Sequence, residues 1–227
     1  MRQIVVLPTM SLGARGLPCE RAVVRAIEDI APARILVTGV AADAACVGCS
    51  PAPCTACLSD EELYKRYRDF VGKILTVGSR PSLGFVGLGA DALPGCTCRS
   101  CSRIWLENDD VEALPAAHEL TPGWCVLGRS VQMCRNTGAA PGQTAVTLAR
   151  RRKVSVIVGD TGRLGVGRLK VVGDGTELVL TGLEVGSLML RGEAVKVDRR
   201  RTSELGFGVV TLDGGSVVNI RGMTVWK

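Results

Sequence analysis

Two apolar stretches, Gln3–Leu7 (QIVVL) and Arg34–Gly39 (RILVTG), decide how the first part of the chain folds. Short runs rich in Val, Ile and Leu are typical of buried strands. Between them, Pro18 can open a helix that carries Val23 and Ile27 on one face. A strand, a helix and a second strand within about 35 residues predict a βαβ unit with parallel strands and a right-handed crossover.

The pattern continues outward from this unit. Ser59–Glu62 has the sequence of a capping box, which predicts a helix from there to about Leu75. Ser82–Gly87 is a third apolar stretch and predicts a third strand. We therefore expect residues 1–143 to form a cysteine-rich α/β metal-binding domain with a partly parallel sheet and metal-stapled loops.

From Thr144 onward the pattern is β. Apolar strands are separated by Gly-rich turns at spacings of about 8–12 residues, which is typical of a small antiparallel barrel or sandwich. The expected strands are Val154–Val158, Leu169–Val172, Leu178–Leu180, Leu188–Leu190, Ala194–Val197, Gly208–Leu212 and Val217–Ile220. Residues 144–227 are thus expected to be a basic, all-β domain, separated from the first by a linker near Asn136–Gly142.

Length and composition exclude some classes of protein. The chain has 227 residues, of which 46% are hydrophobic and 22% charged, so a disordered chain is not expected. No apolar run approaches the roughly 18 residues of a membrane helix, and the stretch after Met1 is too short for a secretory signal. We expect a chain without a membrane partner, in the cytoplasm or in a particle assembled inside the cell.

Cysteine spacing is the strongest chemical signal. All ten cysteines lie between Cys19 and Cys134. A C-x-x-C turn brings two sulfurs close enough to share one metal ion, and neighbouring pairs can complete a four-thiolate shell. Seven cysteines form two clusters that are expected to bind metal: Cys46, Cys49, Cys54 and Cys57, then Cys96, Cys98 and Cys101. The pairing of these ligands stays open, within the first cluster or between the two, with Cys19, Cys125, Cys134 and His118 as additional ligands.

Zinc is the metal that we expect, in a closed structural site. An iron–sulfur cluster ranks below zinc, because the spacing x2, x4, x2 does not match ferredoxin runs. Disulfides or free thiols are the other alternative, and the absence of a secretory signal argues against disulfides.

The single histidine limits the enzyme classes. Zinc proteases with an H-E-x-x-H motif and sites with two or three histidine ligands need more than His118. His118 has no partner nucleophile nearby in sequence, so we expect an ordinary surface residue and assign no catalytic residue. An α/β enzyme remains a second alternative, with a pocket at the carboxyl ends of the parallel strands. Its candidate groups are Thr9, Ser11, Arg15, Thr38, Asp43 and a reactive Cys19.

Positive charge is concentrated in the second half of the chain. Residues 121–227 contain 16 Lys or Arg and 8 Asp or Glu, whereas residues 1–120 contain 12 and 14. Two runs stand out and attract polyanions, although such runs also occur as solvated strand ends. They are Arg150, Arg151, Arg152 and Lys153, and then Arg199, Arg200 and Arg201.

These patterns favour a non-catalytic component of a larger particle, viral or nucleoprotein, over an enzyme. The zinc-stabilised half would supply a rigid platform, and the basic β half would contact other protein subunits or polyanions. The first alternative is a nucleic-acid-binding protein that acts alone, with the arginine runs on phosphates.

Overall fold

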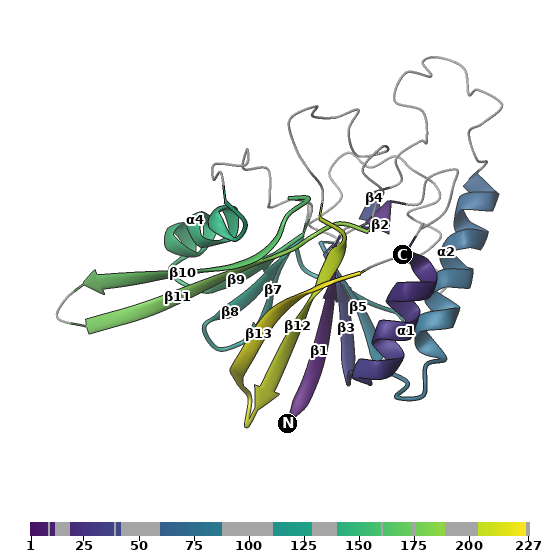
Figure 1. Ribbon diagram of the computed structural model, residues 1–227, viewed down its shortest axis with the longest axis horizontal. Helices are drawn as coiled ribbons and strands as arrows, with labels where there is room; N and C mark the ends of the chain where they lie inside the picture. The colour runs from purple at the N-terminus through teal and green to yellow at the C-terminus, as the bar shows by residue number, and fades with distance from the viewer. Residues whose placement is uncertain are drawn as a thin grey trace, which may run out of the picture.

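Two mixed β-sheets stack face to face, and helices cover their outer faces (Figure 1). The structure is a computed structural model that describes residues 1–8, 10–11, 19–38, 40–41, 60–87, 111–128, 140–159, 161–173, 176–188 and 204–225. The three helices of this part are α1 (Glu20–Ile30), α2 (Asp60–Leu75) and α4 (Gln143–Arg152). The chain is therefore a mixed α/β protein.

The first sheet has the strand order β13-β12-β1-β3-β5-β6. Its four parallel strands are β1 (Arg2–Leu7), β3 (Arg34–Val37), β5 (Ser82–Val86) and β6 (Val111–Leu114). An antiparallel hairpin, β12 (Gly206–Asp213) with β13 (Ser216–Thr224), pairs with the other side of β1. The predicted βαβ unit, β1-α1-β3, is confirmed by the parallel pairing of β1 and β3.

The second sheet has the strand order β10-β11-β9-β8-β7. Its central strand β9 is parallel to both neighbours, and the outer pairs are antiparallel. Its strands are β7 (Ala117–Thr121), β8 (Trp124–Leu127), β9 (Ser155–Val158), β10 (Leu164–Gly173) and β11 (Thr176–Val185). Two short strands, β2 (Met10–Ser11) and β4 (Val40–Ala41), form a separate parallel pair.

Side chains alternate in direction along each strand, so each sheet packs against a different layer on each of its two faces. On β1, Val5 and Leu7 pack with α1 and α2, whereas Ile4 and Val6 pack against the second sheet. On β9, Ile157 faces the first sheet and Val158 packs with α4. Because strand side chains alternate in direction, a sheet buried on both faces reads as a continuous apolar run. This accounts for the unbroken runs in the sequence.

The expectation of an all-β second half was wrong in two respects. Helix α4 occupies residues 143–152, and β9 pairs in parallel rather than antiparallel fashion. Ala145, Leu148 and Ala149 lie on the buried side of α4, a helical spacing that the strands downstream obscured. Strands from both sides of residue 143 also share each sheet, since β12 pairs with β1 and β9 pairs with β8.

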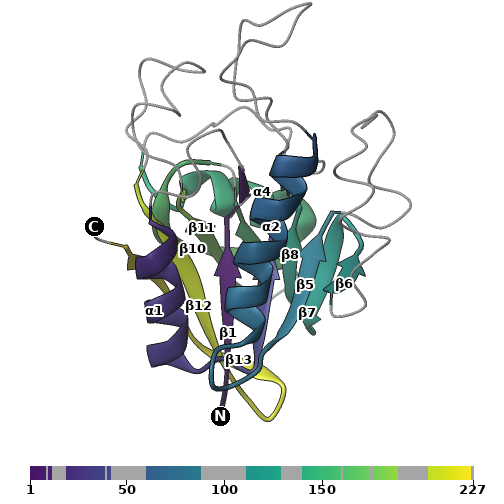
Figure 2. The ribbon, with the colours of Figure 1, turned by 90° about the vertical axis from the view of Figure 1, so that its right-hand side faces the viewer.

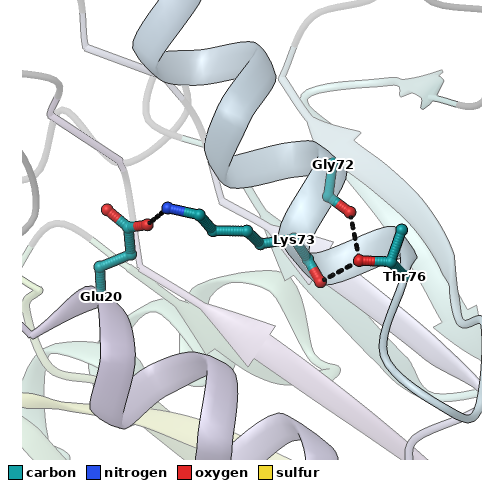
Figure 3. Close-up of polar contacts among 4 residues, drawn as sticks. All are labelled: Glu20, Gly72, Lys73 and Thr76. Atoms are coloured by element: carbon teal, nitrogen blue, oxygen red, sulfur yellow. Dashed lines mark hydrogen bonds and ion pairs between the residues drawn. The ribbon is translucent and has the colours of Figure 1, made fainter.

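Helices α1 and α2 lie side by side on the outer face of the first sheet (Figure 2). Their buried faces include Val23 and Ile27 from α1 and Phe70 and Ile74 from α2. Figure 3 shows the ion pair between Glu20 and Lys73 that joins the two helices. The end of α2 is closed by Thr76, whose hydroxyl donates to the carbonyls of Gly72 and Lys73, with O···O distances of 2.8 and 3.1 Å.

Candidate functional site

The carboxyl ends of the parallel strands in the two sheets meet at one edge of the sandwich. Next to the end of β9, a Cβ on Gly159 would lie 1.9 Å from the hydroxyl oxygen of Thr38, which follows β3. Next to the end of β8, a Cβ on Gly128 would lie 2.7 Å from the carbonyl oxygen of Val86. Both positions therefore require glycine, because any side chain would push the sheets apart. The two sheets are in close contact along this edge.

Both cysteine clusters continue from this edge. The first is in residues 42–59, which connect β4 to α2, and the second is in residues 88–110, which connect β5 to β6. All seven clustered cysteines lie outside the described residues. The second segment begins two residues after the end of β5. The first begins five residues after the end of β3, beyond the short strand β4. Strands β3 and β5 are parallel neighbours, with Val37 paired with Phe85.

Among the polar groups predicted for an enzyme pocket, Thr38 lies in the described part of the chain with its side chain. Thr38 is completely buried, and its hydroxyl has no hydrogen-bond partner among the described residues. It does not face a pocket open to solvent. Thr9, Arg15 and Asp43 lie outside the described residues, and Ser11 is placed only as part of β2.

Cys19 is a core residue and not a reactive thiol. Its side chain is 3% exposed, and its Sγ donates to the carbonyl of Leu188 at 3.2 Å. Burial raises the pKa of Cys19 to about 11, which suppresses the thiolate that a nucleophile needs. Cys125 is half-buried on β8, where burial also raises its pKa. Cys134 lies outside the described residues.

His118 lies on the edge strand β7. It is half-buried, and its register partner on β8 is Val126. Burial, and then the positive charge of Arg34, hold the pKa of His118 below its ordinary value. These surroundings favour a neutral imidazole with a structural role.

The first basic run forms the exposed end of α4. Arg150, Arg151 and Arg152 occupy the last turn of the helix, and Lys153 caps it in the left-handed conformation with φ 57°. All four residues are exposed. Basic side chains at this end also stabilise the helix by opposing its dipole, so the run has a structural role of its own. The second run, Arg199 to Arg201, lies outside the described residues.

Sequence reasoning missed Glu184. This residue of β11 is fully buried, and its Oε1 accepts hydrogen bonds from the amides of Thr144 and Ala145 at 2.8 and 3.3 Å. Gly142, the residue at the usual capping position of α4, has no side chain for this purpose. Glu184 therefore caps α4 from the neighbouring sheet. No local sequence signal points to it, because the cap comes from 40 residues away.

Within the described ranges, no three His, Cys, Asp or Glu side chains are grouped so that they could hold a metal ion. No helix in that part of the chain is long and apolar enough to cross a membrane.

Comparisons with known proteins give little. No protein-family model matches the sequence, and no curated protein matches it. Among solved structures, the chain is similar to Vps29 from Entamoeba histolytica, which was crystallised in complex with Zn²⁺. That match is 12% identical, covers 98% of each chain and has a TM-score of 0.43. A similarity of this size assigns neither a family nor a function to the chain.

Proposed function

We propose that this chain is a non-catalytic, zinc-stabilised assembly protein, a component of a larger nucleoprotein or viral particle. The observation that carries the proposal is the adjacency of β3 and β5, since the second cysteine segment follows β5 and the first follows β3 by way of the short strand β4. Neighbouring strands are about 4.8 Å apart. Thiolate ligands from the two segments therefore start close to one another, as a shared metal site requires.

Chain length supports this proposal. Cys46 follows Ala41 by five residues, Cys96 follows Gly87 by nine, and Cys57 precedes the start of α2 by three. An extended chain spans up to about 3.5 Å per residue, so both clusters can reach a common point. The zinc ion would close a thiolate shell and order the two connections.

Metal analysis of the full chain tests the proposal. Native mass spectrometry is expected to find stoichiometric zinc, and chelation is expected to lower the Tm. A Cys46→Ser/Cys49→Ser variant should lose zinc and stability together, whereas Cys125→Ser, at a half-buried thiol outside both clusters, should keep the metal. A chain without stoichiometric metal, or one whose Tm ignores chelation, contradicts the proposal. Stoichiometric iron with sulfide would identify the iron–sulfur alternative, and loss of free thiols without reductant would identify disulfides.

A second candidate function, contact with polyanions, is favoured by the exposed end of α4. Four consecutive basic residues are presented there on a rigid element, which suits contact with phosphates of any sequence. If this end binds nucleic acid, the logarithm of the affinity should fall linearly with the logarithm of the salt concentration.

Replacing Arg150, Arg151 and Arg152 by Ala should weaken binding to all DNA sequences alike and make the salt dependence shallower. The matched control replaces Arg21, Arg25 and Arg221 by Ala, three exposed arginines of α1 and β13. Equal losses in both variants would indicate a general charge effect and contradict a site at α4.

A further inference from the structure

The β10–β11 hairpin carries most of the exposed large apolar side chains of the described chain. Val172 is 71% exposed, Val179 55%, Leu178 48% and Val166 38%, and beyond this hairpin only Met1 and Val218 are comparable. Three of these residues lie at its far end, defined as residues 170–172 of β10 and 177–179 of β11. Figure 1 shows the hairpin extending away from the first sheet, and no strand of the first sheet in the described part of the chain lies against this end. Apolar exposure concentrated in one place marks an interaction surface.

The outer side of β10 is an open strand edge. Among the described strands β10 pairs only with β11, over ten residues without a bulge. Long, regular edge strands present unpaired N–H and C=O groups that another strand can pair with. An added strand at this edge would also cover the neighbouring apolar side chains.

Charge defines the partner. Arg168 and Lys170 are exposed on the same side of β10, two residues apart. Lys170 forms an ion pair with Glu177 of β11 at 2.6 Å, and Arg168 has no ion-pair partner among the described residues. Val166 and Val172 lie on this same side, before and after the two basic residues. The other side of β10 presents Leu169 and Val171, which are half-buried, and Val171 packs with the buried face of α4. A strand that fits this edge has acidic residues opposite Arg168 and Lys170 and apolar residues on its other side.

We propose that the outer edge of β10, residues 168–172, binds an extended segment of a partner protein in which acidic and apolar residues alternate. A second copy of this chain fits less well, because pairing β10 with itself around residues 168–170 brings Arg168 and Lys170 opposite like charges. The proposal rests on the proposed function in treating the chain as a subunit of an assembly. It does not depend on zinc, so metal analysis and peptide binding can fail separately.

The probe is a labelled eight-residue peptide of alternating valine and glutamate, tested on the full chain by fluorescence anisotropy. Hydrogen exchange is expected to show new protection of the amides of residues 168–172 when the peptide binds. A peptide of the same charge with proline at every second position should not bind, because it cannot form the strand ladder.

Charge reversal sharpens the test. Arg168→Glu/Lys170→Glu should weaken binding of the glutamate peptide about tenfold or more and should improve binding of the matching lysine peptide. Arg221→Glu, on the exposed edge strand β13, is the matched control and should change neither affinity. The proposal is overturned by no binding at millimolar peptide, by equal binding of the proline peptide, by insensitivity to charge reversal, or by dimerisation of the chain through β10.

Discussion

The β10–β11 hairpin has a packed half and an exposed half. In its near half, residues 164–167 of β10 and 182–185 of β11, Leu183 and Val185 are fully buried between the sheets. At its far end, Val172 and Val179 of the same strands are mostly exposed. The strands are regular throughout and their pairing is continuous. The difference thus comes from the layers above and below the hairpin, and not from the strands themselves.

The largest effect is expected where α4 presses on the near half. A Cβ on Gly182 would lie 2.5 Å from backbone atoms of Ala145 and Val146. Gly182→Ala should therefore force α4 off the sheet and lower the free energy of unfolding by about 3 kcal/mol. Gly72→Ala is the control, since nothing lies within 4 Å of that position in α2, and it should raise stability by about 0.5–1 kcal/mol. Denaturant titrations of both variants measure the contrast, and equal effects would contradict it.

The cap of α4 comes next. Glu184→Ala removes the acceptor of two buried amides and should cost about 2 kcal/mol, with faster hydrogen exchange in the first turn of α4. Glu184→Gln keeps an oxygen acceptor for both amides and should cost less, although it removes the carboxylate opposite the helix dipole and places an NH2 group where Oε2 has no partner among the described residues. If Glu184→Ala and Glu184→Gln lose the same free energy of unfolding, the hydrogen bonds from the amides of Thr144 and Ala145 do not stabilise α4.

A stabilising change is expected where the two sheets meet. Thr38 is buried, and its hydroxyl has no partner among the residues that the structure describes, so Thr38→Val should raise the free energy of unfolding by about 1 kcal/mol. Thermal unfolding measures the change in stability. Thr147→Val is the comparison variant, because the hydroxyl of Thr147 already donates a hydrogen bond to the carbonyl of Gln143. A loss of stability in Thr38→Val would show that its hydroxyl has a partner in the folded chain.

His118 gives a smaller, pH-dependent effect. Burial and Arg34 lower its pKa in the folded chain, so the unfolded chain binds more protons below its ordinary value of 6.5. The contribution of neutral His118 to the free energy of unfolding is therefore fully present above pH 6.5. It is lost as the pH falls from 6.5 toward the pKa of His118 in the folded chain. Because His118 is the only histidine, the difference in unfolding free energy between the wild type and His118→Asn isolates this contribution. A difference independent of pH from 5 to 8 would contradict the assigned surroundings.

The smallest effect is expected at the far end of the hairpin. Val172→Thr keeps a β-branched side chain at a position that is 71% exposed, so stability should change by less than about 0.5 kcal/mol. Calorimetry of the isolated chain measures this. A loss as large as that of Gly182→Ala would mean that another part of the chain covers the far end.

Local parts of this fold could be predicted and distant ones could not. The βαβ unit and the helix that ends at Leu75 depend on neighbouring residues, and both were predicted. The pairing of β12 with β1 and the cap by Glu184 join residues far apart in sequence, which periodicity does not encode. Helix α4 was missed because its short apolar face precedes strands with a stronger pattern. The cysteine clusters lie outside the described residues, so the metal site stays a prediction.

Strand β1 is synthesised long before β12, one of its two neighbours in the sheet. Ile4 pairs with Val210, about 200 residues later in the chain. At 5–20 residues per second, the ribosome needs about 10–40 s to make that stretch. For that time the edge of β1 that later pairs with β12 has no partner strand, and an unpaired apolar strand edge is prone to pair with other chains.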